Sequence, residues 1–142
     1  MKFARVFLFV FGSLICSACA EQPTGTYVDP AAVTVMPSPW PKPAIAAPNA
    51  PPRILALWMN ETKIPSGSDW RGRVVTSTNV ASVEIRTESF SFVAERPAFG
   101  VFQFRQHVLD MVPYYKRNYV VQVVARNTAG DQTIRLVPVE FR

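Results

Sequence analysis

The chain has very few cysteines, and their positions exclude a disulfide within the region that follows them. Of its 142 residues only Cys16 and Cys19 are cysteine, and both lie among the first twenty. Residues 21–142 therefore cannot form a disulfide among themselves, and they contain no thiol nucleophile and no cysteine ligand for a metal ion. A domain in this part of the chain has to be held together by its hydrophobic core.

Histidine is equally scarce. His107 is the one histidine, and a hydrolytic triad would need it beside Ser89 or Ser91 as nucleophile, with Asp110 to orient the ring. Neither serine stands in a Gly-x-Ser-x-Gly turn, which would expose a strained nucleophile. The sequence therefore predicts no catalytic residue, and we expect a protein that is not an enzyme.

Clustered charge is also missing. The acidic residues Asp69, Asp110 and Asp131 are isolated along the chain, unlike the Asp-x-Asp pattern of calcium loops, so we expect no metal and no cofactor. The basic residues are mostly single arginines, and Lys116-Arg117 is the one adjacent basic pair beyond the amino-terminal region. Because nucleic-acid binding needs a basic cluster or stripe, we expect no nucleic-acid partner.

The first twenty residues have the three-part layout of an export signal. Lys2 and Arg5 precede a run of about ten mostly apolar residues, Val6 to Ile15, and small residues follow. This run is too short to span a bilayer comfortably as a retained helix. We expect residues 1–20 to be a signal peptide and the protein to be extracytoplasmic: secreted, periplasmic or lipid-anchored at the cell envelope.

Two cleavages remain open at the end of this signal. The small residues Ala18 and Ala20 suit a cut after Ala20, which would release a soluble chain. The stretch Cys16-Ser17-Ala18-Cys19 also resembles a bacterial lipobox, although an aliphatic residue normally stands where Cys16 does. In that case Cys19 would carry a lipid, which would be the protein's one attachment to a membrane.

Residues 21–52 form a segment rich in proline and alanine. Nine of the 13 prolines lie in it, as in the stretch MPSPWPKP. Proline lacks the amide donor and restricts the residue before it, which excludes a helix or a central strand. We expect a disordered, extended linker in which Trp40 either folds back on the domain or touches an outside partner.

Residues 53–142 read as short strands separated by turn residues. Phe102 and Phe104 alternate with polar residues, for example, and are expected to point inward to the core. Pro97 and Gly100 are expected to bracket a turn. These features predict an all-β fold, a seven-stranded antiparallel sandwich over residues 53–142. The expected strands are Ile54–Met59, Arg71–Ser77, Val80–Thr87, Ser89–Glu95, Val101–Val108, Tyr119–Arg126 and Thr133–Phe141.

The strand that begins at Tyr119 carries the most specific pattern, Tyr119-x-Val121-x-Val123-x-Ala125-x-Asn127-x-x-Gly130. It resembles the penultimate strand and hairpin of fibronectin type III domains and of bacterial immunoglobulin-like domains. The resemblance implies an immunoglobulin-like sandwich in an extracellular setting, with the alternate residues from Tyr119 to Ala125 in the core and Asn127 and Gly130 in the hairpin. It also implies a tyrosine corner, in which the Tyr119 hydroxyl bonds to the backbone of the preceding connection.

The loop Tyr114-Tyr115-Lys116-Arg117 is the main candidate for partner binding, together with Trp70. Trp58 and Trp70 are also the two alternatives for the buried tryptophan of the core, and the sequence leaves that choice open. Aromatic and cationic side chains at one pole of a sandwich can stack on a sugar or contact a protein. We expect a non-enzymatic, envelope-associated interaction or structural module whose partner is an extracytoplasmic protein or polysaccharide. The alternative is a small carbohydrate- or cell-wall-binding module that uses these loop aromatics, which an exposed coplanar aromatic pair would favour.

Overall fold

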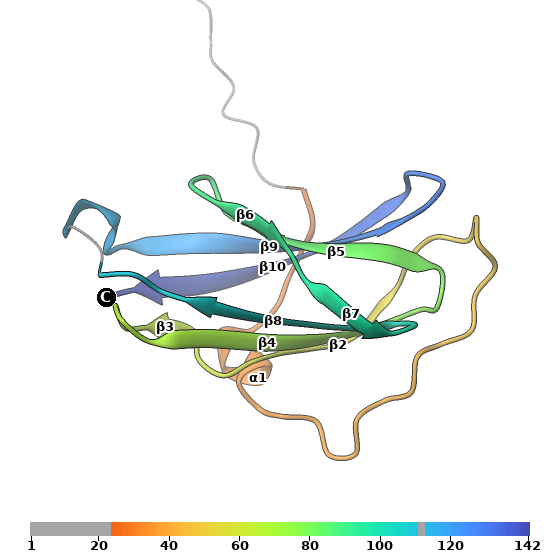
Figure 1. The fold of residues 1–142 in the computed structure, drawn as a ribbon, viewed down its shortest axis with the longest axis horizontal. Helices are drawn as coiled ribbons and strands as arrows, with labels where there is room; N and C mark the ends of the chain where they lie inside the picture. The colour runs from red at the N-terminus through yellow and green to blue at the C-terminus, as the bar shows by residue number, and fades with distance from the viewer. Residues whose placement is uncertain (1–23, 111–112) are drawn as a thin grey trace, which may run out of the picture.

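Two β-sheets packed face to face make up the protein in the computed structural model, which describes residues 24–110 and 113–142 (Figure 1). The larger sheet has the strand order β1-β10-β9-β5-β6, with β3 also paired to β10. The smaller sheet has the order β2-β4-β8-β7. The predicted all-β class is confirmed. The predicted signal peptide and Cys19 lie outside the described residues.

The described residues form ten strands instead of the seven predicted. The larger sheet contains β1 (Thr26–Tyr27), β3 (Lys63–Ile64), β5 (Val80–Arg86), β6 (Ser91–Val93), β9 (Asn118–Asn127) and β10 (Gln132–Phe141). The smaller sheet contains β2 (Ile54–Met59), β4 (Asp69–Thr76), β7 (Glu95–Ala98) and β8 (Val101–His107). A short helix, α1 (Pro30–Val33), and a 3₁₀ turn, η1 (Pro113–Tyr115), complete the elements. The unpredicted strands β1, β3 and β7 are too short to leave a hydrophobic period in the sequence.

The hairpin of β9 and β10 has the alternation expected from the sequence. Tyr119, Val121, Val123 and Ala125 are buried, and Val121 lies opposite Val137 of β10. The side chain of Asn127 accepts a hydrogen bond from the backbone N–H of Asp131 at 2.9 Å. Gly130 has a φ of 94°, in the left-handed region that glycine enters without a steric penalty. Local sequence therefore defines this hairpin.

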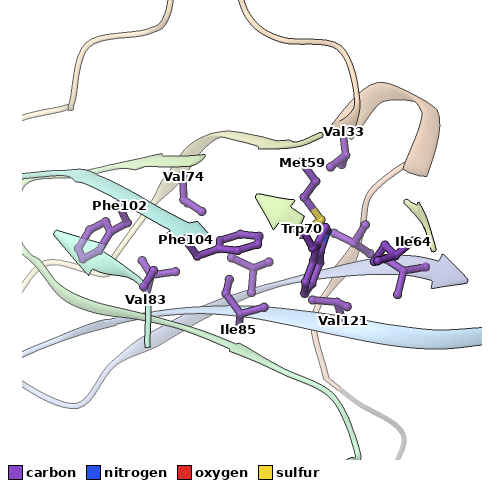
Figure 2. Packing of buried hydrophobic residues seen from close by; sticks show 14 of the residues in the cluster. Val33, Met59, Ile64, Trp70, Val74, Val83, Ile85, Phe102, Phe104 and Val121 are labelled. Carbon is purple, nitrogen blue, oxygen red and sulfur yellow. The ribbon is translucent and has the colours of Figure 1, made fainter. Parts of the chain in front are cut away.

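Trp70 lies at the centre of the core, which corrects its assignment as a partner-binding residue. It is fully buried, and its ring makes edge contacts with Phe104 at 5.0 Å and Phe141 at 6.0 Å between centroids. Figure 2 shows it between the labelled side chains of Met59 and Val121. Its charged neighbours Asp69 and Arg71 do not mark a loop, because β4 begins at Asp69 and successive residues of a strand point to opposite faces.

The structure also corrects the expected disorder of the proline-rich segment, for residues 24–52. β1 pairs with β10 in parallel, with Thr26 opposite Arg135. α1 is capped by Asp29, whose side chain accepts from the N–H of Ala31 at 2.9 Å. Val33, at the end of α1, is 1% exposed and belongs to the hydrophobic core. The segment therefore adds an apolar side chain to the sandwich.

Residues 34–52 follow the sandwich around one end before entering β2 (Figure 1). The carbonyl oxygen of Ala44 accepts from the N–H of Thr78 at 2.8 Å, and that of Ala50 accepts from the side chains of Asn79 and Asn127. A proline-rich segment has few N–H donors but keeps every carbonyl, and these carbonyls find donors on the domain. The exclusion of a central strand is consistent with the structure, but the exclusion of a helix was wrong, because Pro30 lies in the first turn of α1, where a missing N–H is tolerated. The docking of the segment was not expected from its composition.

The chain changes sheets between β6 and β7, which is visible in Figure 1. β6 pairs with β5, whereas β7 pairs with β8 through Glu95 opposite Gln103 and Ala98 opposite Val101. Pro97, expected in a turn, lies within β7, where an edge strand tolerates the missing N–H. Beyond Gln103, β8 has β4 on one side and no strand on the other within the described residues.

Among the helices that the structure describes, none combines the length and apolar character needed to cross a bilayer.

Candidate functional site

A groove of about 620 Å³ lies over the outward face of the smaller sheet and reaches round its edge to β6. We call it the outer groove. Its polar lining comes from β4, β8 and β7, and its two tryptophans come from β2 and from the proline-rich segment. Its lining includes the side chains of Arg71, Arg73, Arg105, Gln103, Gln106, Glu95, Trp40 and Trp58.

Strand register brings these residues together. Arg73 lies opposite Trp58 of β2 on one side and Gln103 of β8 on the other, and Arg71 lies opposite Arg105. Directly opposed residues on one face of an antiparallel pair have Cβ atoms about 4.5–5.5 Å apart. The outer groove therefore has one row of an indole, a guanidinium and an amide, and a second row of two guanidinium groups.

The carboxylate of Asp69 balances the positive charge of Arg105, one of the three arginines that line the groove. Arg105 donates from Nε to Oδ2 of Asp69 at 3.0 Å and also from Nη2 to the same oxygen, while Nδ1 of His107 lies 3.0 Å from Oδ1. The hydrogen bonds from Arg105, first, and from His107 hold the pKa of Asp69 below its ordinary value. Asp69 therefore neutralises the charge of Arg105 at the end of the smaller sheet where β4 begins.

Arg71 and Arg73 have no such partner among the described residues. Neither forms an ion pair there, and Nε of Arg73 is buried without a hydrogen-bond partner. The guanidinium carbon of Arg73 lies 4.6 Å from the ring centroid of Trp40, within cation–π range. Trp40 thus folds back on the domain, one of the two outcomes expected for it. The groove presents two cations, one of them fixed in orientation.

The side chains of the predicted loop, Tyr114 to Arg117, lie together, but the two tyrosine rings do not form a flat platform. Tyr114 is 72% exposed and Tyr115 is 45% exposed, and their rings meet edge to face at 5.2 Å with an interplanar angle of 85°. Lys116 is exposed beside them. The rings are therefore not coplanar, and the feature that would favour sugar stacking on this loop is missing from it.

Arg117 of the same loop is already engaged within the protein. Its Nη2 donates to Oε1 of Glu88 at 2.6 Å, and its guanidinium lies 5.0 Å from the ring centroid of Tyr119. The hydroxyl of Tyr119, chiefly, raises the pKa of Arg117, so the group stays charged. The Tyr119 hydroxyl in turn donates to the carbonyl of Tyr115 at 3.2 Å, the corner implied by the resemblance. These contacts hold the connection into β9.

His107 is paired with an acid instead of a hydroxyl. Its Nδ1 contacts Asp69, and neither Ser89 nor Ser91 is among its hydrogen-bond partners in the structure. In residues 24–110 and 113–142, no three His, Cys, Asp or Glu side chains are grouped so that they could hold a metal ion. The groups the structure does bring together, guanidinium, indole and amide, are suited to recognition.

The sequence analysis missed the outer groove because its arginines are dispersed along the chain. Arg71 and Arg73 are two residues apart on one strand, and Gln103 and Arg105 have the same spacing on another. That spacing puts each pair on one face of its strand, which was a usable signal. The antiparallel register that aligns the two pairs is a long-range property, and only the folded chain displays it.

No protein-family model matches the chain, and no curated protein matches it in sequence.

Proposed function

We propose that this chain is a non-enzymatic, immunoglobulin-like module that works outside the cytoplasm and binds its partner in the outer groove. The fold part of the proposal is supported by the strand order. When the strands are lettered along the chain from β2, the smaller sheet β2-β4-β8-β7 corresponds to strands A, B, E and D of an immunoglobulin sandwich, and β10-β9-β5 of the larger sheet to strands G, F and C. β6 then corresponds to the additional C′ strand.

Tyr119 supports the same assignment. It stands at the start of β9, the F-strand equivalent, and its hydroxyl reaches back to the backbone of Tyr115. A tyrosine corner at this point is a feature of immunoglobulin-like sandwiches, where it pins the connection between the two sheets. The fold hosts many unrelated functions, so the site has to carry the rest of the argument.

The observation that carries the binding role is the row of Trp58, Arg73 and Gln103 across three strands, with Trp40 stacked on Arg73. Tryptophan and arginine are, with tyrosine, the residues enriched at the energetic centres of interfaces, because they combine large contact area with directional donors. In contrast, the alternative that relies on Tyr114, Tyr115 and Trp70 has lost support, since Trp70 is buried and the tyrosines meet edge to face.

An extracytoplasmic role rests on the sequence of residues 1–20. If Cys19 carries a lipid, the docked segment shortens the tether that the sequence suggested. Thr24 is the first described residue and β1 follows at Thr26. Five residue steps from Cys19 to Thr24 reach at most about 17 Å when fully extended. A lipidated chain would therefore hold the sandwich close to the membrane surface.

The mass of the mature amino terminus tests the export part of this proposal. We expect either an acylated Cys19 from membranes or a chain that begins at Glu21 from the soluble extracytoplasmic fraction. Under lipidation, Cys19→Ala moves the protein out of the membrane fraction, whereas the matched variant Cys16→Ala leaves it there. An intact chain beginning at Met1 in the cytoplasmic fraction would contradict export.

A further inference from the structure

We infer that the outer groove binds an anionic saccharide, a chain of pyranose rings that carry carboxylates. The inference rests on the binding role proposed above for this groove and adds the chemical class of its ligand. The charge of the groove, the orientation of its guanidinium groups and the position of its indoles each contribute to it.

Arg71 and Arg73 supply the recognition of anions. They are two positions apart on the same face of β4, about 7 Å along the strand. The planar fork of a guanidinium matches the two oxygens of a carboxylate, and charge-assisted pairs of this kind are the stronger hydrogen bonds. Arg105 is already paired with Asp69, so Arg71 and Arg73 are the groove arginines that remain available to bind an external carboxylate.

Arg73 is oriented in advance. Trp40 covers its guanidinium at 4.6 Å. The stacking removes rotamer freedom before binding, so less entropy is lost when a carboxylate docks.

The tryptophans and amides favour a sugar over another anion. Trp58 and Trp40 are half-buried at the groove, where an indole face can pack against the apolar face of a pyranose ring. Gln103 offers a donor and an acceptor, which suits ring hydroxyls. A small inorganic anion would use the arginines and leave Trp58 and Gln103 without a role.

An acidic peptide is the main competitor, because β8 has an open edge beyond Gln103. A peptide added there as a strand would lie in the plane of the sheet. The side chains of Arg71, Arg73 and Trp58 project from the face of the sheet, perpendicular to that plane. A ligand that uses them has to lie across the face, as a short saccharide can.

Glu95 sets the direction of the ligand. It lies opposite Gln103 at the β7 side of the groove and would repel a carboxylate placed there. The anionic groups are therefore expected over β4, with the neutral part of the sugar chain toward β8 and β7.

Binding of trigalacturonate to the full-length chain, measured by titration calorimetry, tests the inference. We expect trigalacturonate to bind at least about tenfold more tightly than cellotriose, a neutral chain of the same length. Arg71→Gln, Arg73→Gln and Trp58→Ala should each weaken binding by about tenfold or more. The matched control is Arg53→Gln, which removes an exposed arginine outside the groove and should leave the affinity unchanged.

Three results would overturn the inference. These are no binding of trigalacturonate by a chain whose near-ultraviolet circular dichroism shows it to be folded, an equal loss in Arg53→Gln and Arg73→Gln, and tighter binding of hexaglutamate than of trigalacturonate. The last would replace the saccharide by an acidic peptide and leave the groove's binding role intact. The amino-terminal mass tests export independently of either probe.

Discussion

Arg73 and Trp40 join two parts of the molecule that are far apart in the sequence. The guanidinium carbon of Arg73, on β4, lies 4.6 Å from the ring centroid of Trp40, in the proline-rich segment. Because both side chains are half-buried, the contact is partly shielded from water, which strengthens a cation–π pair. The same contact docks the segment and orients Arg73, the arginine that we propose binds the ligand.

Removing this aromatic ring should loosen the segment. We expect Trp40→Ala to lower the free energy of unfolding by about 1 kcal/mol, the size of a partly exposed cation–π interaction. Protease cleavage within residues 34–44 should become faster, since the segment loses a contact with the sheet. Urea unfolding and limited proteolysis measure the two effects. Ile45→Ala is the control, because Ile45 is 92% exposed; equal effects of both variants would contradict the docking role of Trp40.

The tyrosine corner can be tested by deleting one oxygen. Tyr119→Phe removes the hydroxyl that donates to the Tyr115 carbonyl but keeps the buried ring. We expect a loss of about 0.5–1.5 kcal/mol in the free energy of unfolding, the usual net value of one hydrogen bond. Tyr27→Phe, at a 60% exposed position, should change it by less. Chemical denaturation of the two variants side by side decides the matter, and an unchanged Tyr119→Phe would speak against the corner.

Asp69 should make stability depend on pH in the acid range. Its pKa is lowered in the folded state, mainly by Arg105 and then by His107, so its contribution is complete above the unfolded pKa of about 4. The contribution is lost as the pH falls through the lower folded value. We expect Asp69→Asn to flatten the fall in midpoint temperature between about pH 6 and pH 2. Asp110→Asn should retain the wild-type slope; a slope unchanged in Asp69→Asn would refute the pairing.

The limits of sequence-based prediction are clearest at Trp70 and its neighbours. The expected strand began at Arg71, which left Trp70 in a loop, whereas β4 begins at Asp69 and points the indole inward. A difference of two residues at a strand boundary therefore exchanged a core residue for a surface one. Phe102 and Phe104, inside a longer alternating run, were placed inward correctly.

The proline-rich segment shows a different limit. Its prolines exclude a central strand, and the described part contains only the short edge strand β1, but the expected absence of a helix was wrong, because α1 begins at Pro30. Whether such a segment stays free depends on donors elsewhere, here Thr78, Asn79 and Asn127. Those donors are remote in the chain, so composition could not reveal that the segment docks.

Local patterns were sufficient for the all-β class, for most strands and for the β9–β10 hairpin, because side-chain alternation and a left-handed glycine act between near neighbours. The outer groove needed the assembled sheets. Arg71 meets Arg105, and Arg73 meets Gln103 and Trp58, only after distant strands pair in one register. Pairing of that kind is selected by burial of the whole core, which no short stretch of the chain encodes.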